Sequence, residues 1–72
     1  MALTDYEKNF LKELIENHLA QLEVRLMEGS ITPEFAINEL LFVVAICGKL
    51  DIKIPEKVPD IINLAVKKLR GD

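Results

Sequence analysis

The sequence predicts an all-α protein: a helical hairpin of a long amphipathic helix and an apolar helix, then a short third helix after an extended connector. Signals for helix starts and ends divide the chain into three segments, and the first has the 3.6-residue apolar period of an amphipathic helix. A chain of 72 residues has room for one domain. We therefore expect a single helical domain over residues 1–72, which forms a multi-helix bundle as a homodimer.

The first helix is expected over about residues 5–28. Thr4 is a favourable N-cap, and Glu7 three residues later completes a capping box. The first glycine of the chain, Gly29, stands where a left-handed residue is preferred after a helix. At about 100° per residue, one half of this helix carries apolar side chains and a single histidine. These residues are Phe10, Leu11, Leu14, Ile15, His18, Leu19, Leu22 and Leu26.

The second helix is expected over about residues 33–47. Thr32 is its N-cap, Pro33 takes the first helical position, and Gly48 is expected to end it. From Leu40 to Cys47 no residue is polar, so this half of the helix is apolar on every side, as in buried helices. The same run also contains residues that favour strands, but the strong N-cap favours a helix.

The break between these two helices is short, which predicts an antiparallel hairpin. Its residues 26–35, Leu-Met-Glu-Gly-Ser-Ile-Thr-Pro-Glu-Phe, are similar to the helical-hairpin turn of small bacterial oligomerisation modules such as the SHOCT domain. The resemblance covers the turn alone, and no function is carried over from it.

The third helix is expected over about residues 59–70, after a connector over residues 48–58. Apolar and charged residues alternate in the connector, which is typical of an extended segment. Val58 precedes a proline and is therefore biased away from the helical conformation. We expect Pro59 at the first position of the third helix and Asp60 at the second.

The net charge of −3 argues against broad nucleic-acid binding, which needs a basic surface. One alternative is a helical dimer that contacts phosphates through the basic end of the third helix, at Lys67, Lys68 and Arg70. The same residues also complement the negative end of the helix dipole. We therefore do not expect nucleic acid to be the main partner.

The single histidine and the single cysteine are too few for a zinc site or a disulfide. His18 lies on the apolar half of the first helix, and we expect a buried polar residue or an interface residue there. Cys47 is expected at a helix C-terminus, which does not activate a thiol, and is interpreted as a small buried residue. With no nucleophile, phosphate-binding or metal-binding motif present, we expect no catalytic residue, no cofactor and no enzymatic activity.

The apolar content of 50% exceeds what such a short chain can bury by itself. We expect a homodimer with the second helix near the two-fold axis. The dimer is expected to act as a protein–protein interaction or regulatory accessory module, with a larger protein as a further partner. A second alternative is a dimer that binds an apolar small molecule in its interior. The expected interface residues are Leu40, Leu41, Val43, Val44, Ile46, Cys47, Leu19 and Leu22.

The longest apolar run has eight residues, too few for the roughly 20 that span a bilayer, so no membrane contact is expected. The N-terminus has no basic region followed by an apolar one, which would mark a secretory signal. With one cysteine and no such signal, the chain is expected to be cytoplasmic.

Overall fold

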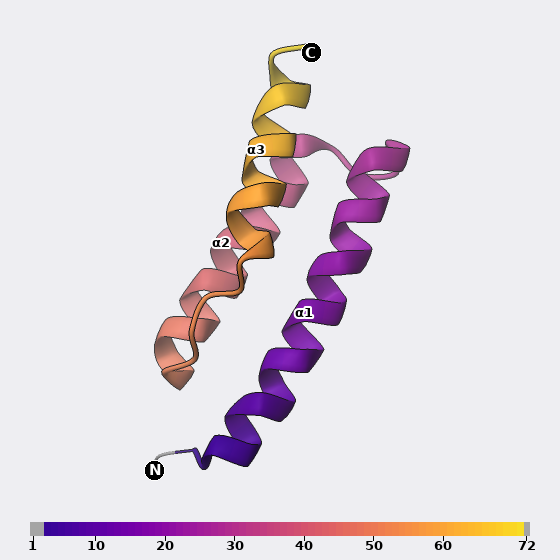
Figure 1. The fold of residues 1–72 in the computed structure, drawn as a ribbon. Helices are drawn as coiled ribbons and strands as arrows, with labels where there is room; N and C mark the ends of the chain where they lie inside the picture. The colour runs from indigo at the N-terminus through magenta and orange to yellow at the C-terminus, as the bar shows by residue number, and fades with distance from the viewer. Residues whose placement is uncertain (1–2, 72) are drawn as a thin grey trace.

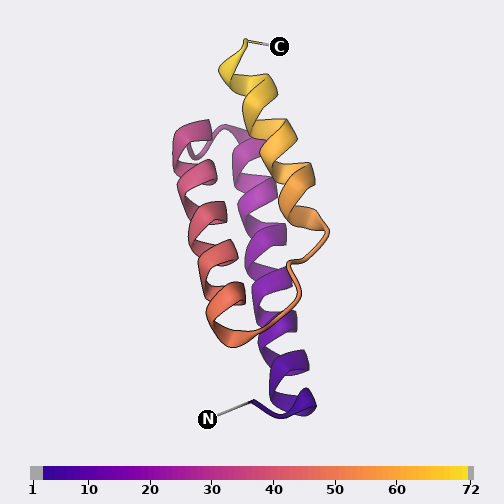
Figure 2. The same cartoon turned by 90° about the vertical axis from the view of Figure 1, so that its left-hand side faces the viewer.

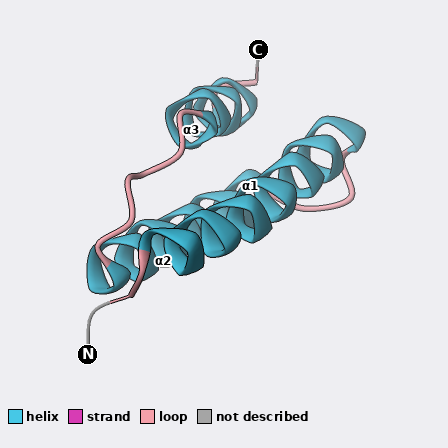
Figure 3. Ribbon diagram, turned by 60° about the horizontal axis from the view of Figure 1, so that its bottom comes forward, coloured by secondary structure: helices cyan, strands magenta, loops and turns pink. Residues whose placement is uncertain are grey.

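The computed structural model describes residues 3–71 and confirms an all-helical chain, with three helices and no strand among these residues (Figure 1). Helix α1 spans Asp5–Glu28, α2 spans Pro33–Leu50, and α3 spans Lys57–Leu69. Helices α1 and α2 form the expected antiparallel hairpin. The chain then returns along it, and α3 packs on one side of the pair (Figure 3). The result is an elongated bundle of 44 × 17 × 16 Å.

The start of α1 confirms the predicted capping box. The Thr4 hydroxyl accepts a hydrogen bond from the Glu7 backbone N–H at 3.1 Å, and the Glu7 carboxylate accepts one from the Thr4 N–H at 2.8 Å. The Thr4 backbone N–H, and secondarily the Thr4 side chain, favour the charged Glu7 carboxylate, so the pKa of Glu7 is lowered. At the other end, Gly29 has φ of 80°, and the Ser30 N–H donates to the Arg25 carbonyl at 2.9 Å. Both helix ends therefore lie where local sequence chemistry predicts them.

The end of α2 differs from the prediction, because the helix continues to Leu50 rather than stopping at residue 47. The left-handed residue is Asp51, with φ of 56°, and Gly48 lies inside the helix. The N–H of Ile52 donates to the Cys47 carbonyl at 2.9 Å, which closes the turn. This later ending allows the Ile52 side chain to enter the core, where it is buried. Burial of one apolar side chain thus outweighed the local preference for glycine after the helix.

Gly48 is now an interior helix glycine that the chain's own packing does not require. A Cβ atom at this position would meet no atom within 4 Å, and its φ is not in the left-handed region. We expect Gly48→Ala to raise the free energy of unfolding of the monomer by about 1 kcal/mol, because alanine is the better helix former. Urea unfolding at low protein concentration measures this change. Gly29→Ala is the matched control, and it should lower stability because Gly29 has a positive φ. A loss of stability in Gly48→Ala would contradict this account.

Helix α3 begins at Lys57, two residues earlier than predicted. Pro59 is tolerated in the first helical turn, because the N–H groups there have no partner within the helix. Val58 adopts the helical conformation despite the following proline, and its side chain is 3% exposed. Burial of Val58 therefore overrides the local bias, and the connector shortens to residues 51–56.

The core lies between the three helices and receives side chains from each of them and from the connector. No polar side chain among the described residues is fully buried. The buried apolar residues are Leu19, Leu22, Leu26, Ala36, Leu40, Val43, Cys47, Ile52, Val58, Ile61 and Ala65. One side of each helix is thus buried within a single chain, and the opposite side is exposed to solvent.

Candidate interaction surface

The structure divides the predicted interface residues into two groups. Five of them are buried in the core of the single chain and are therefore not available to a second copy. These five are Leu19, Leu22, Leu40, Val43 and Cys47. Val44 and Ile46 are partly buried, and only Leu41 of the predicted set is exposed. In the single chain, α1 and α3 together cover more of α2 than its uniform apolar pattern could reveal, and a role for the predicted residues at an oligomer interface stays a prediction.

The part of α2 that remains open faces away from both other helices. Its most apolar members are Phe35, Leu41 and Phe42, whose exposed fractions are 49%, 60% and 67%. Of these, sequence analysis had placed only Leu41 at an interface. We call the exposed residues of this helix the α2 outer strip. The strip consists of Glu34, Phe35, Asn38, Leu41, Phe42, Ala45, Gly48 and Lys49.

A second apolar stripe runs beside this strip on α1. Phe10 and Leu14 are both about half exposed, and they share a face with His18 because the three are spaced by four residues. The His18 Nε2 atom lies 4.0 Å from a carboxylate oxygen of Glu39 in α2, which places this face of α1 next to α2. Phe35 and Phe42 flank the same Glu39 at a shallow surface hollow. Exposed apolar side chains of α1 and α2 therefore lie on either side of the His18–Glu39 contact.

His18 is not buried within the chain, contrary to one of the two expectations for it. Its side chain is half exposed and faces the carboxylate of Glu39 at the junction of α1 and α2. An ion pair at this exposure contributes little to stability. A role for His18 at an interface stays a prediction.

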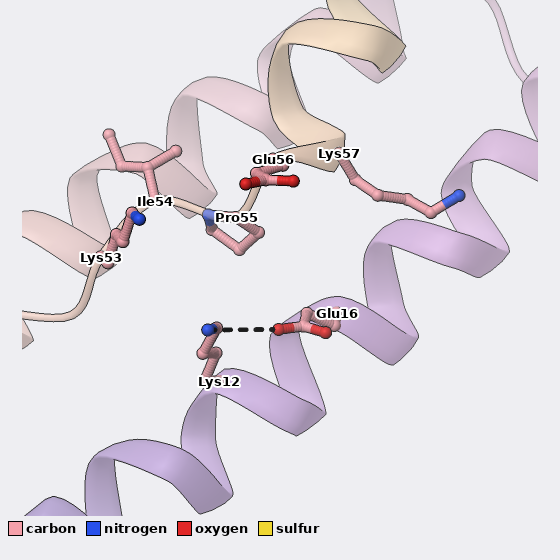
Figure 4. A pocket seen from close by; sticks show the side chains of 7 residues that line it. All are labelled: Lys12, Glu16, Lys53, Ile54, Pro55, Glu56 and Lys57. Atoms are coloured by element: carbon pink, nitrogen blue, oxygen red, sulfur yellow. Dashed lines mark ion pairs between the residues drawn. The ribbon is translucent and has the colours of Figure 1, made fainter.

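A polar hollow of about 370 Å³ lies between α1 and the connector (Figure 4). Lys12 is 3.9 Å from Glu16 across one edge, and the Lys57 ammonium donates to Glu23 at 2.8 Å beside it. This hydrogen bond and the charge of Glu23 raise the pKa of Lys57. Because lysine and glutamate charges alternate around the hollow, it offers no concentrated charge for a ligand or for acid–base chemistry.

The basic end of α3 lies at one tip of the bundle. Lys67 and Arg70 are exposed and Lys68 is partly buried. Lys67 and Lys68 belong to the last turn of the helix, where positive charge complements the dipole. The structure thus brings the three residues to one helix end, and phosphate contact by them stays a prediction.

Cys47 has no exposed surface, and its burial raises the pKa of its thiol. Because the thiolate is the reactive form, we expect Cys47 to react slowly with a disulfide reagent such as DTNB while the protein is folded. The rate should increase with urea in parallel with unfolding followed by circular dichroism. The control is Met27→Cys in a Cys47→Ala background, since Met27 is exposed and its replacement should react at once. Fast reaction of Cys47 in the folded protein would contradict its burial.

Within residues 3–71, no three histidine, cysteine or acidic side chains come together as a metal ion would need. Nor does any described helix have the length and apolar character required to cross a membrane. No known protein family, curated protein or solved structure matches this chain significantly.

Proposed function

We propose that this protein is a non-catalytic protein–protein interaction module that acts as a homo-oligomer, most simply a homodimer. The observation that carries the proposal is the exposure of Phe35, Leu41 and Phe42 along one strip of α2. Aromatic side chains are enriched at the centre of protein interfaces. A cluster of exposed apolar side chains is typical of an interaction site.

Energetic considerations support self-association over an isolated chain. Full burial of a phenylalanine or leucine side chain contributes about 1.5–3 kcal/mol relative to its exposure to water. A single chain leaves more than half of Leu41 and Phe42 in water. A second copy offers the same apolar strip in return, and a two-fold interface uses one patch twice. A larger protein would then bind to surfaces that self-association leaves open.

Sedimentation equilibrium between 1 and 100 µM tests the proposal on the full chain. We expect the mass to rise to twice that of one chain as the concentration increases. A well-folded protein that keeps the monomer mass across the whole range would contradict it. An excess mass beyond the dimer in native mass spectrometry would instead support the alternative of a bound apolar small molecule.

A further inference from the structure

We propose that two copies of this chain pair through their α2 outer strips in antiparallel orientation, with the two-fold axis between Leu41 and Phe42. This inference rests on the proposed self-association and adds to it a defined occupant, orientation and register. Figure 2 shows α2 at the outside of the bundle, with no other helix on its outer side. The partner that fits this strip is a second α2.

The spacing of the exposed residues in α2 supplies the register. Five of them, at positions 34, 38, 41, 45 and 48, are spaced by four, three, four and three residues, an average of about 3.5, which is the repeat of helices that pack side by side along a seam. The full strip is also symmetric about the point between residues 41 and 42. In an antiparallel pair centred there, four kinds of residue pair share a level along the seam. These are Glu34 with Lys49, Phe35 with Gly48, Asn38 with Ala45, and Leu41 with Phe42.

Charge complementarity favours the antiparallel orientation. Glu34 and Lys49 lie at opposite ends of the α2 outer strip, and both are exposed. The antiparallel register places Glu34 of each copy beside Lys49 of the other, so that two opposite-charge pairs close the ends of the interface. In a parallel pair, Glu34 would lie beside Glu34 of the second copy and Lys49 beside Lys49. These like charges would repel each other.

A small residue lies at the middle of the seam in the same register. Ala45 shares its level with Asn38 of the second copy, and at 100° per residue both lie near the centre line of the α2 outer strip. Gly48 lies inside a helix, where glycine is unfavourable, and no contact within the chain requires it. A second helix that approaches closely along this side accounts for small residues that the single chain does not need.

The α1 stripe extends this interface beyond one helix. A standard protein interface buries about 800 Å² per partner, more than one strip of a short helix provides. Phe10 and Leu14 add exposed apolar side chains on α1, on the face that carries His18 beside Glu39 of α2. The two-fold axis brings both α1 helices to the same side of the α2 pair.

Cysteine cross-linking tests the register. Asn38 and Ala45 face one another across the seam in the antiparallel pair, whereas the two copies of Asn38 are offset by seven residues, about 10 Å. We expect Asn38→Cys and Ala45→Cys proteins to form a disulfide-linked dimer when mixed, and neither to do so alone. Native Cys47 is buried and serves as the background control in the unmodified chain.

The outcomes separate this inference from the proposed function. A protein that sediments as a dimer but gives no cross-link specific to the mixture overturns the register and leaves the interaction module intact. Cross-linking of Asn38→Cys with itself would indicate a parallel pair and would also overturn it. A folded protein that remains monomeric contradicts both proposals.

A charge exchange provides a second test that needs no covalent bond. In Glu34→Lys and in Lys49→Glu, each homodimer would contain two like-charge pairs, and we expect its dissociation constant to rise about 3- to 10-fold. Mixing the two variants restores opposite charges at both ends, so the heterodimer should form with nearly the original affinity. Single variants that associate as tightly as the original chain, or a mixture that shows no recovery, would contradict the antiparallel pairing.

Discussion

Replacement of Leu40 by alanine is expected to lower the free energy of unfolding by about 3 kcal/mol, because it leaves a cavity in the core. The Leu40 side chain is completely buried among the apolar residues of the core. A domain of this length has a total stability of about 4–11 kcal/mol. The variant should therefore melt at a much lower temperature, and part of it should be unfolded at 37 °C. Urea unfolding followed by circular dichroism measures the loss.

Leu41→Ala is the matched control for this prediction, because the same substitution occurs one residue away in the same helix. Leu41 is exposed in the single chain, so its loss should change the monomer's stability by less than about 0.5 kcal/mol. At concentrations where the protein associates, Leu41→Ala should lower the free energy of unfolding by more than it does in the monomer. The reason is that the dimer stabilises the folded state, and the substitution weakens the dimer. Equal losses in the two variants at low concentration would show that α2 is oriented differently from the structure described above.

These two neighbouring leucines show where sequence reasoning reaches its limit in this protein. The helices themselves were predictable, because caps and turn residues act locally. Thr4 and Gly29 bound α1, and Thr32 begins α2, through contacts within a few residues along the chain. The local rules gave the wrong helix end where contacts between residues far apart in the sequence determine it. Ile52 and Val58 are drawn into the core, and they shift the end of α2 and the start of α3.

The candidate site was only partly predictable for a related reason. The side of a helix that packs against its own chain is usually recognised from the alternation of apolar and polar faces. A helix that is apolar on all sides lacks this alternation, so its sequence does not show which side is buried. Leu40 and Leu41 are chemically identical, and only the placement of α1 and α3 distinguishes them. For this reason, sequence analysis did not identify Phe35 and Phe42 as exposed residues of the helix. The predicted helix ended at residue 47 and therefore left out Gly48 and Lys49. With α2 extended to Leu50, these two residues fall on the same side of the helix as Glu34, and the outer strip can be recognised from the sequence.

Phe42→Glu is expected to abolish dimer formation at micromolar concentration while leaving the monomer folded. Each dimer would contain two copies of Phe42, whose burial contributes about 1.5–3 kcal/mol apiece. Because Phe42 is 67% exposed in the single chain, loss of both contacts corresponds to a dissociation constant at least about 30-fold higher. The buried glutamates would add a further desolvation cost near the two-fold axis. Because Phe42 is largely exposed in the single chain, the helical content of the monomer should not change.

Val24→Glu is the control, since Val24 is an exposed apolar residue on α1 away from the α2 outer strip. It introduces the same charge on a helix surface, and its mass in sedimentation should equal that of the original chain. Dissociation in both variants would point to a general effect of added negative charge rather than to an interface on α2. A dimer that persists in Phe42→Glu would exclude the outer strip, and the stripe of Phe10 and Leu14 would become the next surface to test. Circular dichroism of each variant at the sedimentation concentration separates loss of association from loss of fold. The combination of a folded Phe42→Glu monomer and a dimeric Val24→Glu protein would therefore locate self-association on the outer side of α2.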